Sequence, residues 1–215
     1  DLKIADTTIV LYTTDNGAEL ALWPDGAMTM FRGEKGTTWE GGFRIPMMVR
    51  WPGVIKPGTV YNDIISLMDW FPTFLAAAGV PDIKEKLKAG TTAGKKKFKV
   101  HLDGYNFLPY FKGEVKAGPR DAIYYFDQAG NLNALRVYDW KISFAVQHGN
   151  IATATRDVTA WAGITNLRMD PYERGMEEGG QALTFVGQQM WLLVPAQAKI
   201  KEFFVRFGQE EAFPQ

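Results

Sequence analysis

The sequence has 215 residues, of which 46% are hydrophobic and 22% charged, with 24 basic and 24 acidic side chains. This is the composition of a globular protein of one large domain or one and a half, long enough to bury a sizeable core. The balanced charge, without a long basic stripe, gives no indication of nucleic-acid binding. The absence of cysteine excludes disulfides, zinc–thiolate sites and cysteine nucleophiles within these residues.

The first predicted element is an apolar strand close to the start. Residues 7–13 (TTIVLYT) are β-branched and apolar, which predicts a strand buried on both faces inside an α/β sheet. Such a strand needs neighbours on both sides, so we expect the sequence to begin in the middle of a fold. We find no signal-peptide pattern and no apolar run of membrane-spanning length, and we expect no membrane partner.

The next hundred residues mix loops with one clear helix. Residues 18–39 have no sustained period and predict a long loop, and residues 43–51 predict a short strand. Apolar residues recur every three or four positions over residues 64–79, where we expect the regular helix to begin near Phe71. Residues 84–99 are rich in lysine and predict an exposed excursion.

The last hundred residues predict a small antiparallel sheet with a covering helix. Three short strands follow closely on one another, over residues 122–126, 133–138 and 140–146. A further strand is predicted at 164–168, and residues 185–207 show helical spacing that Pro195 must interrupt or restart. We therefore predict an α/β fold in two domains, residues 1–115 and 116–215, with the closing helix on the second sheet.

Two adjacent oxygen donors follow the first strand. Asp15 and Asn16 lie at its carboxyl end, the position where α/β sheets bind ligands. A carboxylate beside an amide carbonyl suits calcium or magnesium, although calcium takes six to eight oxygens and further ligands must come from elsewhere. Taken alone, Asp-Asn-Gly is also an ordinary turn sequence.

A glycine-rich segment carries a second candidate residue. Lys35 lies between Gly33 and Gly36, and glycines let the backbone approach a ligand closely. A lysine there can offer its charge to an oxyanion, beside backbone N–H donors for sulfate or phosphate. The alternative is an exposed lysine in a loop. The segment 166–173 (NLRMDPYE) predicts a strand and a proline turn with a structural role.

Four segments in order resemble the sulfatase family, especially arylsulfatases. They are IVLYTTDNGAE, FRGEKGTTWEGGFRIPMMVRWPG, SLMDWFPTFLAAAGV and NLRMDPYE. The resemblance implies that residues 1–115 are the later part of the alkaline-phosphatase/sulfatase-like catalytic domain. It also implies that Asp15 and Asn16 ligate calcium and that Lys35 contacts the substrate sulfate. Relatives are often periplasmic or secreted, but the sequence itself indicates no compartment.

The family's nucleophile is missing from these residues. Sulfatases use a formylglycine made within Cys/Ser-x-Pro/Ala-x-Arg, and no such motif occurs here. We therefore expect a fragment, the carboxy-terminal portion of a sulfatase, which is inactive alone. We expect it to form a homo-oligomer or to pair with an amino-terminal sulfatase half, and to meet a sulfate ester only in the complete enzyme. Two alternatives remain open, namely a non-catalytic oligomerising or binding module and part of a phosphate or phosphonate ester hydrolase.

Overall fold

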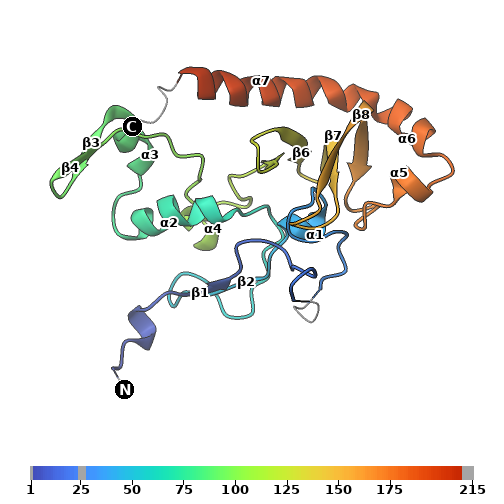
Figure 1. Ribbon diagram of the computed structural model, residues 1–215. Coiled ribbons are helices and arrows are strands. Elements are labelled where there is room, and N and C mark those ends of the chain that lie inside the picture. The colour runs from blue at the N-terminus through green and yellow to red at the C-terminus, as the bar shows by residue number, and fades with distance from the viewer. Residues whose placement is uncertain (1, 24–27, 210–215) are drawn as a thin grey trace. The chain divides into compact units, whose positions relative to one another are not determined.

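The computed structural model describes residues 2–23 and 28–209, and it forms two compact units (Figure 1). The first unit comprises the beginning of the chain up to Leu11, Met48–Asp121 and the end of the chain from Val205. The second unit comprises Tyr12–Met47 and Ala122–Phe204. Both units are discontinuous in sequence, and the division at residues 115 and 116 stays a prediction. Within the described residues, no helix is long and apolar enough to cross a membrane.

The early strand is present but more exposed than the sequence predicts. After the short helix η1 (Ala5–Thr7), strand β1 (Val10–Thr13) pairs with β2 (Met47–Arg50) in a sheet of two strands. Val10 is 53% and Tyr12 57% exposed, so the prediction of a strand buried on both faces is wrong for this chain. The physical reason is that β2 is the one strand that pairs with β1 in the described part of the chain.

The first unit is mainly helical and packs around aromatic side chains. Its elements are η2 (Leu67–Asp69), α2 (Trp70–Ala77), α3 (Ile83–Ala89), β3 (Thr91–Ala93), β4 (Lys96–Phe98) and α4 (Leu108–Phe111). The regular helix begins at Trp70, one residue before the predicted start, after a capping box formed by Ser66 and Asp69. Most residues of 84–99 are exposed, as predicted, and α3 and the β3–β4 hairpin, which the sequence analysis did not predict, occupy this segment.

The second unit is built on the antiparallel sheet that the sequence predicts. Its strands lie in the order β5 (Ala122–Phe126), β6 (Leu132–Val137), β7 (Trp140–His148) and β8 (Thr155–Asn166). The last strand begins well before the predicted residue 164 and pairs with β7 in two stretches on either side of an irregularity. A short helix that the sequence analysis missed, α1 (Glu40–Phe43), lies within the glycine-rich segment.

Helices at the end of the chain cover this sheet, which confirms the predicted fold class. They are α5 (Gly175–Glu178), α6 (Ala182–Gln189), η3 (Met190–Leu192) and α7 (Leu193–Gln209), and Figure 1 shows α5 and α6 beside β8. Pro195 lies in the first turn of α7, where proline is tolerated. Ala196 packs against Leu135 and Ile142 in the core. Trp191, in η3, is 62% exposed.

Candidate functional site

The two segments that carry the candidate residues lie against each other in the second unit. We call residues 15–17 the acidic turn and residues 33–42 the lysine loop. The backbone N–H of Lys35 donates to the carbonyl oxygen of Ala18 at 2.9 Å. The Glu34 carboxylate accepts from the N–H of Leu20 at 2.7 Å. These bonds hold the chain just beyond the acidic turn on the lysine loop, so the fold brings the two motifs together.

Glycine at position 17 is required by a close backbone approach. The N–H of Gly17 donates to the carbonyl oxygen of Gly42 at 2.9 Å. A Cβ atom on Gly17 would lie 1.7 Å from the carbonyl oxygen of Gly41, a separation that no side chain can accept. The glycine of the acidic turn therefore allows the turn to pack against α1, and it fixes where Asp15 and Asn16 lie.

A cavity of about 240 Å³ is lined by the acidic turn on one side and by residues of the four-stranded sheet on the other. It is lined by Asp15, Asn16, Gly36, Thr37, Gly42, Phe43, Phe126, Asp127, Gln128 and Gln147. The Lys35 ammonium instead pairs with the Glu19 carboxylate at 3.3 Å, and its side chain is 34% exposed. The lysine loop thus lines the cavity with Gly36, Thr37 and Gly42 but not with Lys35. Sequence reasoning missed Gln128 and Gln147, which are more than a hundred residues from the acidic turn and carry no local signal.

The acidic turn offers the right kind of atoms for calcium but too few of them. The Asp15 carboxylate and the Asn16 amide carbonyl are hard oxygen donors, as calcium requires. The Asn16 Nδ2 donates to the Gly17 carbonyl oxygen at 2.8 Å, so Oδ1 would be the ligand atom. Within the described residues, no cluster of three or more His, Cys, Asp or Glu side chains could hold a metal ion. The pair fits calcium in chemistry, and the remaining ligands would have to come from other groups.

A buried ammonium ties the lysine loop to the sheet. Lys141, on β7, is 1% exposed, and its Nζ donates to the carbonyl oxygen of Thr38 at 2.6 Å. The same atom contacts the carboxylates of Glu173 at 2.6 Å and Glu40 at 3.3 Å. A buried charge is tolerated only with such partners. The sequence contained a signal for this site, namely one lysine in a largely apolar strand, which our sequence analysis did not use.

Several hydrogen-bond donors surround the Glu40 carboxylate and favour its ionised form. Tyr125 donates to Glu40 Oε1 at 2.6 Å, while Arg44 at 2.9 Å and Arg136 at 3.0 Å reach Oε2. Burial raises the pKa of Glu40, but the charges of Lys141 and Arg136, together with the hydrogen bonds from Tyr125 and Arg44, oppose burial and lower the pKa to about 2.

Glu173 joins the loop from the other side. Its Oε2 accepts from the backbone N–H of Glu40 at 2.6 Å. Burial raises the pKa of Glu173, Lys141 opposes that effect, and the charge of Glu40 adds to it. Glu173 ends the NLRMDPYE segment, whose predicted structural role is consistent with the turn bonds of Asn166 and Asp170.

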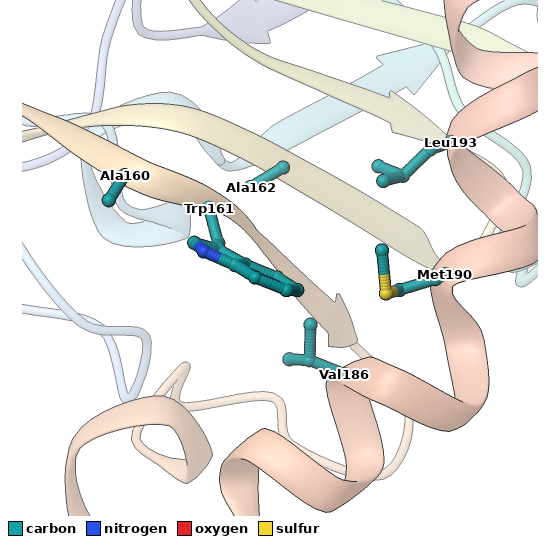
Figure 2. A pocket seen from close by; sticks show the side chains of 6 residues that line it. All are labelled: Ala160, Trp161, Ala162, Val186, Met190 and Leu193. Atoms are coloured by element: carbon teal, nitrogen blue, oxygen red, sulfur yellow. The ribbon is translucent and has the colours of Figure 1, made fainter.

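A second cavity in this unit is apolar (Figure 2). It has a volume of about 320 Å³ and is lined by Ala160, Trp161, Ala162, Val186, Met190 and Leu193. Figure 2 shows that these side chains come from β8 and from the helical segments that follow it. None of the six can ionise or bind a hard cation, so this cavity is not suited to ester hydrolysis.

Replacing Gly17 by alanine should displace the acidic turn, because the added methyl group overlaps the Gly41 carbonyl. We expect a loss of about 1–3 kcal/mol in the free energy of unfolding, measured with urea. The matched control is Gly187→Ala, since a Cβ at Gly187 in α6 meets no atom within 4 Å. That control should stabilise the chain by about 0.5–1 kcal/mol. Equal stability of the two variants would contradict the close approach.

The lowered pKa of Glu40 predicts a pH-dependent stability. Because the folded pKa of about 2 is below the ordinary 4.5, stabilisation by the ionised carboxylate is present above pH 4.5 and is lost toward pH 2. The amount is on the order of 3 kcal/mol. The raised pKa of Glu173 acts in the opposite sense, since protonation relieves its buried charge.

We therefore expect wild type to be more stable than Glu40→Gln at neutral pH, with the gap narrowing as the pH falls below 4.5. Denaturant unfolding at a series of pH values measures the gap. A gap that stays constant from neutral pH to pH 3 would show that Glu40 is not held ionised.

Comparison with known proteins agrees with the four segments found in the sequence. The sulfatase family model matches residues 1–80. Human arylsulfatase A is 31% identical, and the match covers 80% of this chain and 31% of arylsulfatase A. Human N-acetylgalactosamine-6-sulfatase is 38% identical, and the match covers 93% of this chain and 41% of that protein. The crystal structure of the PsFucS1 sulfatase from Pseudoalteromonas sp. matches with a TM-score of 0.64 and 31% identity, covering 86% of this chain and 37% of that one. The chain thus spans less than half of each of these proteins, and over most of its own length it is similar to members of the sulfatase family.

Proposed function

We propose that this chain carries one part of the active site of a sulfuric ester hydrolase. In this proposal Asp15 and Asn16 ligate calcium, and Lys35 contacts the sulfate group. The observation that carries it is the direct bonding of the lysine loop to the segment after the acidic turn, through Lys35 and Ala18. Relatives that are 31% and 38% identical are sulfatases by name, which supports the same chemistry.

The residues present suit the binding of a charged ester. A calcium ion, when bound, would withdraw electron density from the sulfate oxygens. The Lys35 ammonium would neutralise charge that develops toward the leaving oxygen. Its pairing with Glu19 at 3.3 Å is partly exposed to solvent, and such pairs contribute little, so an oxyanion can compete for the ammonium.

We further propose that these 215 residues alone do not hydrolyse sulfate esters. They contain no cysteine and no Ser-x-Pro/Ala-x-Arg sequence, so they lack a precursor of formylglycine. Two candidate calcium ligands are also too few for a tight site. The active enzyme would then need a second polypeptide segment that supplies the nucleophile and further ligands.

A reconstitution assay tests this function. We expect the purified chain to leave p-nitrophenyl sulfate intact, and to give calcium-dependent hydrolysis only with an amino-terminal sulfatase half that carries formylglycine. In that mixture Lys35→Ala should lower kcat/KM by about a hundredfold or more. The control Lys116→Ala, at an exposed residue of the first unit, should change nothing. Metal-dependent turnover by the chain alone would contradict the proposal that the chain is inactive without a second segment. An unchanged kcat/KM in the Lys35→Ala variant would contradict the sulfate contact.

Exposed apolar residues support the proposal that the chain associates with another polypeptide. Val10, Tyr12 and Met48 are 53%, 57% and 63% exposed on the two-stranded sheet. In the described residues β1 has β2 as its strand partner, which leaves its other edge open to pairing. Open edges and apolar patches favour association.

Light scattering at increasing concentration measures this association. We expect an oligomer of the chain, or a complex with an amino-terminal half, and we expect Val10→Lys to weaken it because a lysine at a strand edge opposes pairing. The matched control is Val60→Lys, since Val60 is 78% exposed but lies outside the strands. A monomer at high concentration that also fails to bind the amino-terminal half would contradict the proposal.

A further inference from the structure

The buried charged side chains of Lys141 and Glu173 bind the backbone of the lysine loop, and the proposed function does not involve these contacts. Two of their hydrogen bonds end on the loop's own backbone. Lys141 Nζ binds the Thr38 carbonyl oxygen at 2.6 Å, and Glu173 Oε2 binds the Glu40 N–H at 2.6 Å. A third bond joins the loop to β7, where the Gln147 N–H donates to the Thr38 hydroxyl at 2.9 Å. The loop is thus fixed to the sheet by short bonds from charged side chains.

The path from these bonds to Lys35 is short and stiff. Thr38 and Glu40 are three and five residues beyond Lys35 in the sequence. On either side of Lys35, the Thr37 hydroxyl donates to the Glu34 carbonyl oxygen at 2.7 Å, which closes a tight turn around Lys35. A displacement of Thr38 or Glu40 must therefore move the Lys35 backbone as well.

Glu173 itself is held in an unusual conformation. Its φ is +54°, in the left-handed region that residues other than glycine seldom adopt. Arg32 Nη1 donates to the Glu173 carbonyl oxygen at 2.9 Å, and the Arg32 guanidinium lies over the Trp39 ring at 3.9 Å. Such a conformation persists only where the surroundings impose it, and here Arg32, just before the lysine loop, and Glu40, near its end, both bind Glu173.

We propose that Lys141 and Glu173 are positioning residues, which set the place of the lysine loop and thereby of the Lys35 ammonium. Their role in catalysis rests on the proposed function, because it needs Lys35 to contact sulfate. The geometric part does not, since it concerns only where the ammonium lies. Neither residue lines the cavity beside the acidic turn, so both act through the loop.

The rate at which each lysine reacts with an acylating reagent, measured by mass spectrometry, reports this placement in the full chain. Lys141→Met removes the ammonium, and Glu173→Gln keeps the side-chain volume and one acceptor oxygen. The control is Asp69→Asn, which disturbs a comparably buried ion pair with Arg120 in the first unit. We expect the Lys35 rate, normalised to Lys116, to change about threefold or more in both variants and to stay unchanged in the control.

A merely structural role predicts a different pattern. If Lys141 and Glu173 only stabilise the fold, any variant with the same loss in Tm should change the Lys35 rate equally. Asp69→Asn should then change that rate as much as Lys141→Met and Glu173→Gln do. That result would overturn the proposal, as would a wild-type Lys35 rate in folded Glu173→Gln. If Lys141→Met does not fold, the near-isosteric Glu173→Gln variant still decides the question.

Inorganic sulfate separates this inference from the proposed function. If sulfate with calcium protects Lys35 from acylation in wild type, the sulfate contact is supported, and the protection should weaken in Glu173→Gln. If sulfate gives no protection but Glu173→Gln still changes the Lys35 rate, the positioning role stands and the sulfate contact fails. If sulfate protects Lys35 equally well in wild type and Glu173→Gln, and the Lys35 rate without sulfate is also the same in both, the positioning role fails and the sulfate contact stands.

Discussion

The contact of the Lys141 ammonium with two carboxylates and a backbone carbonyl is the constraint on which the second unit depends. Removing such charges from water costs several kcal/mol for each ion, and their attraction compensates only when the geometry and hydrogen bonding are good. Lys141 and Glu40 are each 1% exposed, and Glu173 is 3% exposed. The three charges therefore require one another, and they require the segments that carry them to meet in one arrangement.

This constraint explains how a loop rich in glycine can have a defined place. Glycines leave the chain free to adopt many conformations, which by itself opposes an ordered binding site. The charged contacts from β7 and from the turn after β8 remove that freedom at Thr38 and Glu40. The antiparallel sheet thus has a second role besides forming the core. It holds the lysine loop in place, and Gln147 on β7 and Gln128 after β5 line the cavity beside Asp15.

Local patterns were sufficient for the sheet and for most of the helices. The strands from Ala122 to His148 follow one another after short turns, and the helix after Ser66 has its own cap, so neighbouring residues decide them. The exposure of β1 and the ion cluster around Lys141 depend on residues far away in sequence. No local pattern encodes that Lys141 meets Glu40, and four segments resembling sulfatases located Asp15, Asn16 and Lys35 without showing what holds them in place.

The central claim, that the acidic turn and the lysine loop form one binding site, is tested most directly by an NMR titration of the isotopically labelled chain. Calcium is added first and inorganic sulfate second, while the Asn16 side-chain amide and the Gly36 backbone amide are observed. Both residues line the same cavity. We predict weak, saturable shifts of both signals with one common affinity for sulfate in the presence of calcium. Shifts at Gly36 that leave Asn16 unmoved, or that do not depend on calcium, would contradict a shared site.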